Sequence, residues 1–366
     1  GTQGLDSGAR IRARNQSDQA VVGGGALGRV FDARGEPLDD LPPLKCLTSV
    51  PLGGSKVNPM QREPIEEVLD IGVRAINALL TMGCGQRIGL IAGSGVGKSV
   101  LLGMMTRFSS ADVIVIGLIG ERGREVKEFI EKILGPQGLR RSVVIASPAD
   151  SSPLLRMRGA NLAHCYAEYF RDQGQNVLLL MDSLTRVAHA QREIGLAIGE
   201  PPAVKGYPSS VFSLLPKLIE RTGRGAGEVG SITAIYTILA EGDDLNDPVV
   251  DIARAALDGQ IALSRDLADE GHFPAIDLQG SVSRLMQVLQ DKAGQQRAIT
   301  FRRLWASFQQ NKDLVQVGAY QDGTNLDLDR ALQIREGMLN FLTQDINEEC
   351  GLADSMQALT ELIDGS

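Results

Sequence analysis

The segment that decides the fold is Ala92-Gly93-Ser94-Gly95-Val96-Gly97-Lys98-Ser99, which follows an apolar run at residues 88–91. It matches a phosphate-binding loop, except that Ala92 stands where a glycine is usual. Its glycines allow several backbone N–H groups to approach the negative oxygens of a phosphate chain at once. Lys98 supplies a mobile positive charge for the β- and γ-phosphates, and the Ser99 hydroxyl is an oxygen ligand suited to Mg²⁺.

The flanking sequence supports this interpretation. The run before the loop has the length of a buried strand, and an amphipathic run follows from Val100, so we expect a helix that begins near Lys98. A plain glycine-rich turn before a helix is the alternative, which this strand and helix context disfavours. The sequence therefore predicts a nucleoside triphosphate site built from Gly93, Ser94, Gly95, Val96, Gly97, Lys98, Ser99 and Val100.

The composition is ordinary for a globular protein. The chain has 366 residues, of which 43% are hydrophobic, enough for one large core or two smaller ones. No apolar run approaches the roughly 20 residues of a membrane-spanning helix, so we expect a soluble protein. The chain opens Gly1-Thr2-Gln3, with no methionine or apolar leader, and we expect it to be truncated at its N-terminus.

The cysteines, histidines and charge exclude several classes of function. Cys46, Cys84, Cys165 and Cys350 are scattered and form no ligand cluster with the three histidines. Neither a disulfide framework nor a zinc site is predicted, and a reducing cytoplasm fits. The net charge of −8 and the 4% of aromatic residues argue against a nucleic-acid partner.

Three regions differ in their pattern. Residues 1–45 contain short, glycine-rich segments that indicate hairpins and a linker. Residues 46–290 alternate β-branched runs with helical patterns, which predicts an α/β domain with a mainly parallel sheet and strands at 88–92, 113–118, 143–146, 177–181 and 232–239. Residues 291–366 show apolar residues at helical spacing, which predicts a small C-terminal helical domain.

Ligands of an open α/β sheet bind beyond the carboxyl ends of its strands, so the residues that follow each strand are candidates for the site. Asp182 ends one buried run and is suited to holding the hydration shell of Mg²⁺. Glu121 follows another and could orient the water that attacks a phosphate. Taken alone, Asp182 could be a helix cap and Glu121 a solvated loop carboxylate. The phosphate-binding loop favours the functional interpretation of both.

The order of these features resembles the RecA-like hexameric ATPases, whose core is a P-loop NTPase fold. Further segments are similar to the type III protein-export ATPases, relatives of the catalytic subunit of the rotary ATP synthase: GERGRE (120–125), LMDSLTR (180–186), GEPPA (199–203) with GYP (206–208), EGDD (241–244), and PAID (274–277) before SVSR (281–284). Other segments resemble the flagellar export ATPase more than the injectisome one: INALL (76–80), AGSGVGKS (92–99), VVIA (143–146) and SFQQN (307–311).

The resemblance implies roles for individual residues in the hydrolysis of ATP with Mg²⁺. Glu121 would activate water, and Glu125 would be an outer contact to magnesium. Arg122 and Arg186 would lie near the γ-phosphate, Phe273 would pack against the adenine, and Arg284 would be an arginine finger acting on the neighbouring subunit's nucleotide. From sequence context alone, Arg284 would be expected in a surface ion pair, and for Phe273 a place in the core is an alternative of nearly equal weight.

The resemblance also implies an assembly. The chain would form a homohexamer in the cytoplasm, peripheral to the inner-membrane secretion apparatus, and would energise the export of flagellar proteins. Its partners would be export chaperones, stalk and regulator proteins, and the membrane export gate. The loop at 199–211 would face the central pore, although an ordinary proline-stiffened loop is an equal alternative. Residues 1–45 would be the remnant of a β-barrel domain.

Four other functions stay open at this stage. One is an injectisome ATPase, and another is the rotary synthase subunit itself, which the segments at 199–208 and 277–284 fit less well. A third is a non-catalytic nucleotide-binding subunit, which Glu121 disfavours because such chains carry glutamine there. A nucleic-acid translocase on the same fold is the fourth, and the acidic charge disfavours it.

Overall fold

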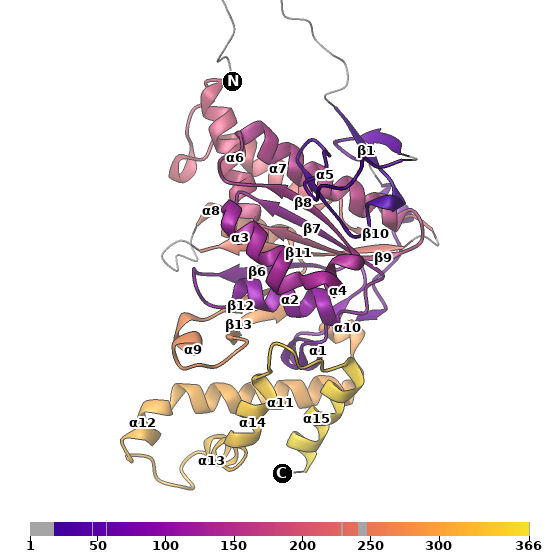
Figure 1. Cartoon of the computed structure of the whole chain (residues 1–366). Helices are drawn as coiled ribbons and strands as arrows, with labels where there is room; N and C mark the ends of the chain where they lie inside the picture. Colours follow the sequence, from indigo (N-terminus) through magenta and orange to yellow (C-terminus); the bar gives the residue numbers. More distant parts are fainter. Residues whose placement is uncertain (1–17, 46, 56, 228–229, 241–246, 366) are drawn as a thin grey trace, which may run out of the picture.

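A nine-stranded sheet forms the centre of the molecule in the computed structural model, which describes residues 18–45, 47–55, 57–227, 230–240 and 247–365 (Figure 1). Eight strands follow one another across it: β13 (Ile276–Ser283), β12 (Gly259–Leu263), β6 (Arg87–Ala92), β11 (Ser231–Leu239), β9 (Asn176–Asp182), β7 (Val113–Ile119), β8 (Ser142–Ser147) and β2 (Arg29–Asp32). All neighbours in this order are parallel except β13 and β12, and β10 (Gly223–Arg224) pairs antiparallel with β11. The predicted α/β fold with a mainly parallel sheet is confirmed.

Both faces of the sheet are covered because its central strands are apolar on both sides. In β7, Ile114, Ile116 and Leu118 join one hydrophobic cluster, whereas Val113 and Val115 join another, as the two-residue period of a strand requires. The first face is covered by α2 (Lys98–Phe108), α3 (Gly123–Glu128), a π-helical turn (Phe129–Leu134) and α4 (Gly135–Arg140). The second is covered by α5 (Pro153–Arg171), α6 (Leu184–Ala197), α7 (Ser209–Ile219) and α8 (Pro248–Ala256).

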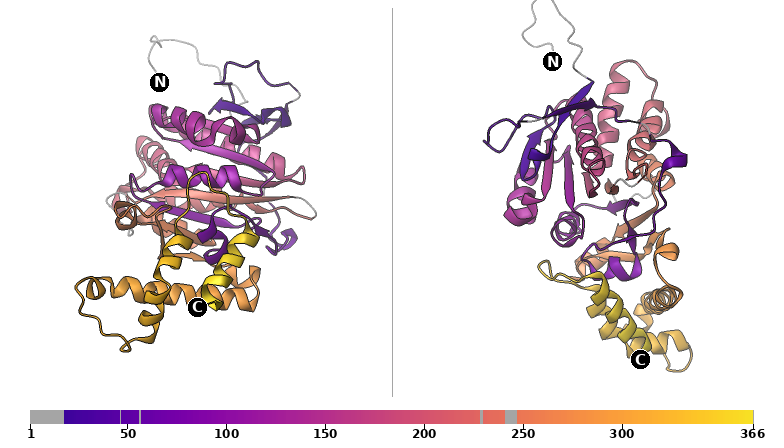
Figure 2. Two further views of the ribbon diagram at one scale, coloured as in Figure 1. Left: turned by 60° about the horizontal axis from the view of Figure 1, so that its bottom comes forward. Right: turned by 90° about the vertical axis from the view of Figure 1, so that its right-hand side faces the viewer.

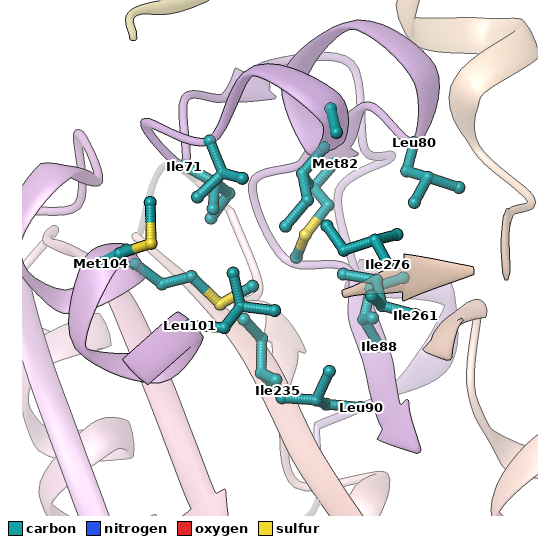
Figure 3. Close-up of a cluster of buried hydrophobic side chains, with 14 of the residues drawn as sticks. Ile71, Leu80, Met82, Ile88, Leu90, Leu101, Met104, Ile235, Ile261 and Ile276 are labelled. Carbon is teal, nitrogen blue, oxygen red and sulfur yellow. The ribbon is translucent and has the colours of Figure 1, made fainter. Parts of the chain in front are cut away.

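Figure 3 shows part of the first cluster, where α2 packs on the sheet. Leu101 of α2 lies beside Ile235 of β11 in this view, and Met104 of α2 and Ile88 and Leu90 of β6 belong to the same cluster; all five are at most 1% exposed. Burial of each such side chain contributes about 1.5–3 kcal/mol. This packing fixes the helix that follows the phosphate-binding loop against the strand that precedes it.

The C-terminal region is helical, as predicted, and gathers at one end of the molecule (Figure 2). It comprises α11 (Lys292–Gln310), α12 (Lys312–Gln316), α13 (Leu326–Gln333), α14 (Arg335–Leu342) and α15 (Leu352–Asp364). The apolar pattern that runs through Leu328 and Met338 is divided between two helices, because the backbone leaves the helical conformation at Ile334. Phe301, Leu304 and Phe341 share the first hydrophobic cluster with α1 (Arg74–Leu79), so these helices continue the core of the sheet domain.

Shorter elements complete the described chain. An N-terminal ribbon pairs β1 (Gln19–Val22) with β3 (Thr48–Pro51), and β4 (Val68–Leu69) pairs with β5 (Met82–Gly83). The short helices are α9 (Arg265–Asp269), α10 (Met286–Leu289) and the 3-10 turns Gly24–Ala26, Pro59–Gln61 and Val204–Gly206. The division of the chain at residue 45 stays a prediction. The position of β2 is relevant to this boundary, because β2 precedes residue 45 and yet forms an edge strand of the central sheet.

Two absences concern the described residues only. None of their helices is long and apolar enough to cross a membrane. Their three cysteines, Cys84, Cys165 and Cys350, are free and buried. Cys46 and the EGDD segment (241–244) lie outside the described residues.

Candidate nucleotide site

The phosphate-binding loop connects β6 to α2 at the carboxyl edge of the sheet. α2 begins at Lys98, as predicted, and Gly97 before it has a φ of 89°. Gly95 has a φ of 80°, so both positions require the left-handed backbone that glycine adopts without strain. Gly97 also meets an aromatic ring, because a β-carbon there would lie 3.4 Å from Phe273.

Ala92 is compatible with the loop because it belongs to the strand. It is the last residue of β6, pairs with Leu239 of β11 and is 1% exposed. Ala92 therefore belongs to the buried end of the strand where it meets the cavity, and the loop itself begins one residue later.

A cavity of about 630 Å³ opens over the loop. Its walls contain eleven residues that the sequence singled out: Gly93, Ser94, Gly95, Gly97, Lys98, Ser99, Val100, Glu121, Arg122, Glu125 and Arg186. Four others lie outside its walls: Val96, Asp182, Phe273 and Arg284. The cavity is large enough for the phosphates and sugar of a nucleotide.

Lys98 lies between the two carboxylates that the sequence predicted. Its Nζ atom is 2.5 Å from Oδ1 of Asp182 and 3.9 Å from Oε1 of Glu121. Asp182 ends β9 and Glu121 follows β7, and these strands are neighbours in the sheet. The three side chains come together because parallel strands end at the same edge. Asp182 is the deepest, with 4% of its surface exposed.

The Glu121 carboxyl is held away from solvent. Its Oε1 atom is buried and accepts no hydrogen bond within the described part of the chain. Burial and the nearby negative charge of Asp182 raise the pKa of Glu121 to about 7, although Lys98 opposes the shift. A carboxyl group with a pKa near neutrality and an unoccupied acceptor atom can take a hydrogen bond from a water molecule.

Arg186 and Arg122 both add positive charge to the cavity, the first from a partly buried position and the second from the surface. Arg186 lies in the first turn of α6, its stem packs on Gly120, and its buried Nε atom has no hydrogen-bond partner among the described residues. A β-carbon at Gly120 would lie 2.7 Å from this stem, so only glycine fits there. Arg122 is 81% exposed and pairs with Glu125 at 3.3 Å.

Phe273 lies next to the phosphate-binding loop, whereas Arg284 lies at the other end of the sheet. The ring of Phe273 lies against Gly97 and is 43% exposed, so it forms a surface beside the loop and is not a core residue. Arg284 follows β13, and its guanidinium donates to the carbonyl of Arg254 at 3.1 Å. Since β13 is antiparallel to β12, Arg284 lies at the amino end of the parallel strands, opposite the phosphate-binding loop.

Sequence reasoning missed several residues of the site. Arg265, Ala149, Leu239 and Ala240 also line the cavity. Arg265 follows β12, a parallel neighbour of β6. The rule that candidates follow the carboxyl ends of strands would have found Arg265, but the short segment that forms β12 was not identified as a strand.

The donors present fit Mg²⁺ bound together with a nucleotide. Within the described ranges no group of three or more His, Cys, Asp or Glu side chains could hold a metal ion. Mg²⁺ in nucleotide sites is held by one or two protein oxygens together with phosphate oxygens and water, and Ser99 and Asp182 are oxygen donors of this kind. The buried acidic pair around Lys98 is therefore consistent with a site that a cation completes.

Comparisons with known proteins agree with this geometry. Residues 72–283 match the nucleotide-binding domain of the ATP synthase alpha/beta family, and residues 290–361 match the T3SS EscN ATPase C-terminal domain. The flagellum-specific ATP synthase of Salmonella typhimurium is 59% identical over 98% of this chain and 80% of its own length.

Two solved structures are also similar. The assembled ATPase EscN of the enteropathogenic E. coli type III secretion system has a TM-score of 0.94 at 42% identity, over 99% of this chain and 87% of the other. EscN in complex with its central stalk EscO has a TM-score of 0.88 at 43% identity, over 94% of this chain and 83% of the other.

Proposed function

Because the chain belongs to the ATP synthase alpha/beta family, and within it to the type III export ATPases, we propose how its residues hydrolyse ATP and how it assembles. It is an ATP-hydrolysing enzyme of flagellar export, since flagellum-specific relatives match it at high identity over nearly its whole length. The observation that carries the mechanism is the contact of Lys98 with Asp182, with Glu121 nearby, beneath a phosphate-binding loop.

The phosphates bind along the loop at residues 93–97 and at the N-terminus of α2. The backbone N–H groups there and the ammonium of Lys98 meet the β- and γ-phosphate oxygens. Ser99 and Asp182 would hold Mg²⁺, with Glu125 as an outer contact. When bound, the ion neutralises charge that develops on the phosphate oxygens. Phe273 offers its exposed ring beside the loop to the adenine.

Glu121 orients the attacking water. Its Oε1 atom accepts no hydrogen bond from the described residues, which supports this role, because an acceptor in a partly dry site can align a water molecule toward the γ-phosphate. Arg186 and Arg122 stabilise the negative charge of the transferred phosphoryl group. The stem of Arg186 is packed on Gly120, whereas Arg122 is exposed, pairs with Glu125 and would have to leave that carboxylate to reach a bound nucleotide.

Arg284 completes the site of a neighbouring subunit in a homohexamer. Its position at the amino end of the strands supports action in trans, because the same chain's phosphate-binding loop is at the other end. Assembled EscN and the EscN complex with a central stalk support a ring with a stalk partner. Export chaperones, regulator proteins and the membrane export gate complete the proposed partners of a cytoplasmic, membrane-peripheral ring, with the loop at 199–211 facing its pore.

Replacement of Lys98 tests the nucleotide site directly. Lys98→Ala leaves the β- and γ-phosphate charges without their mobile cation, so we expect calorimetric titration with ATP to show at least tenfold weaker binding and turnover to be lost. Lys127→Ala is the matched control, because Lys127 is 73% exposed and pairs with Glu131 on the surface. Unchanged ATP affinity and turnover in Lys98→Ala would contradict the assignment of the site.

A further inference from the structure

The Asp182 carboxylate has a second donor that the proposed mechanism does not use. The hydroxyl of Thr237 donates to Oδ1 of Asp182 at 2.6 Å, the same oxygen that Lys98 contacts at 2.5 Å. Thr237 is fully buried, so its hydroxyl is a fixed part of the interior. A hydrogen bond to an ionised carboxylate in such a place is stronger than one between neutral groups.

The pairing of two strands determines this contact. Thr237 lies in β11 and Asp182 ends β9, and the register that joins Tyr236 to Met181 brings the next two residues opposite each other. A second hydroxyl ties the same two segments together, because Thr185 accepts a hydrogen bond from the backbone N–H of Leu239 at 2.9 Å. The end of β11 is thus attached twice to the segment that carries Asp182.

The two donors to Oδ1 differ in what else they can do. Lys98 is the first residue of α2, and its ammonium would contact the phosphates of a triphosphate bound in the cavity. Thr237 does not line the cavity, and among the described residues its one other acceptor is the carbonyl of Met181 at 3.3 Å. Its contact with Asp182 is therefore independent of nucleotide.

We propose that Thr237 is a positioning residue that fixes the Asp182 carboxylate for the magnesium shell while Lys98 turns to the phosphates. The inference rests on the proposed role of Asp182 in holding Mg²⁺. Outer-shell partners of a metal-binding carboxylate act by fixing its orientation, and their loss costs about 10–100-fold in metal affinity. Thr237 should accordingly affect nucleotide binding only when the cation is present.

The test compares ATP binding with Mg²⁺ and with EDTA by calorimetric titration in the nucleotide-free chain. Thr237→Val keeps the shape of the side chain and removes the hydroxyl. We expect the increase in ATP affinity that Mg²⁺ produces to be smaller by about tenfold or more in this variant, and ATP affinity in EDTA to be unchanged. Thr237→Ser retains the hydroxyl and should keep the gain. Thr222→Val is the matched control, because Thr222 is equally buried and its hydroxyl donates to the carbonyl of Ile219, away from the cavity.

The outcomes separate the inference from the function on which it rests. A parent chain whose ATP affinity is the same with Mg²⁺ and EDTA would contradict the magnesium site itself. If Mg²⁺ increases the ATP affinity of the parent chain and Thr237→Val shows the same increase, the proposed role of Thr237 would be overturned. If Thr237→Val does not fold, Thr237→Ala and Thr237→Ser provide the comparison, since they differ only in the hydroxyl, and equal magnesium dependence in the two would overturn the inference.

Discussion

At the scale of single residues, Glu121 couples stability to function. Burial and the Asp182 charge raise its pKa from 4.5 to about 7. The folded state therefore disfavours the ionised carboxylate, and this cost to stability grows between about pH 4.5 and 7 and is constant above. Removal of the charge should stabilise the chain at high pH while it removes the group that orients water.

Glu121→Gln should accordingly raise the thermal midpoint of the nucleotide-free chain at pH 8, and much less at pH 5, while ATP hydrolysis slows by about a hundredfold or more. Scanning calorimetry at both pH values and turnover assays measure the two effects. Glu131→Gln is the control, because Glu131 is 60% exposed in a surface ion pair. The same midpoint change at both pH values would contradict the raised pKa, and normal turnover would direct attention to Glu125.

The residues that the sequence predicted for the site and those it missed differ in a physical way. Lys98, Glu121 and Asp182 follow strands whose apolar runs are easily recognised, so their meeting at one edge could be predicted. Thr237 lies inside β11, and only the register between β11 and β9 directs its hydroxyl to Asp182. A sequence without partners gives no register, so that contact could not be foreseen.

At the scale of elements, the segment from α9 to Phe273 links the nucleotide site to the C-terminal helices. Arg265 lines the cavity, and Phe273 lies on Gly97. On the other side, Glu270 pairs with Lys312 and the His272 ring lies 6.1 Å from that of Trp305 in α11. The backbone carbonyl of Phe273 also accepts a hydrogen bond from the N–H of Gln344 at 3.0 Å.

Trp305 should therefore report nucleotide binding from outside the cavity. It is the single tryptophan of the chain, and its contact with His272 is one residue from Phe273. We expect its fluorescence to change on addition of ATP and to saturate with the same dissociation constant as calorimetric binding. In Phe273→Ala, calorimetry should still detect ATP binding but the fluorescence of Trp305 should no longer follow it, because the loop then has no contact with this segment. An emission that is insensitive to saturating ATP in the parent would exclude the link.

The elements that could be predicted were those with long apolar runs. β6, β7, β8, β9 and β11 lie at or near the sheet centre, and each contains a run that is buried on both faces. The edge strands β2 and β13, and the short strand β12 next to β13, are partly exposed and mix polar with apolar residues, so their sequences resemble loops. Ile334 keeps the helical period across the break between α13 and α14, so the pattern alone could not place that break.

At the scale of the whole molecule, the proposed mechanism divides each nucleotide site between two chains. The phosphate-binding loop, Asp182 and Glu121 are at the carboxyl edge of the sheet, and Arg284 is at the amino edge. Composition and periodicity do not indicate this division, and only the resemblance to the export ATPases implies that Arg284 acts on a neighbouring subunit. Activity should therefore depend on how often two copies meet.

The specific ATPase activity of the chain should rise with its concentration. A dilute monomer lacks the arginine that stabilises the transition state, and such an arginine contributes about a thousandfold or more to related phosphoryl transfers. Arg284→Ala should bind ATP normally and stay inactive at every concentration. Arg303→Ala is the control, because Arg303 is a 58% exposed arginine that pairs with Asp327.

A mixture of two inactive variants tests the sharing of sites most directly. In a ring assembled from equal amounts of Arg284→Ala and Lys98→Ala chains, an interface is complete where the first variant supplies the phosphate-binding loop and the second supplies the arginine. Random assembly makes about one interface in four complete, because each position holds the required variant half of the time. We expect the mixture to recover up to about that share of the parent activity, although neither variant alone is active. Activity that is constant across a hundredfold dilution of the parent, with no recovery in the mixture, would show that each chain hydrolyses ATP without its neighbour.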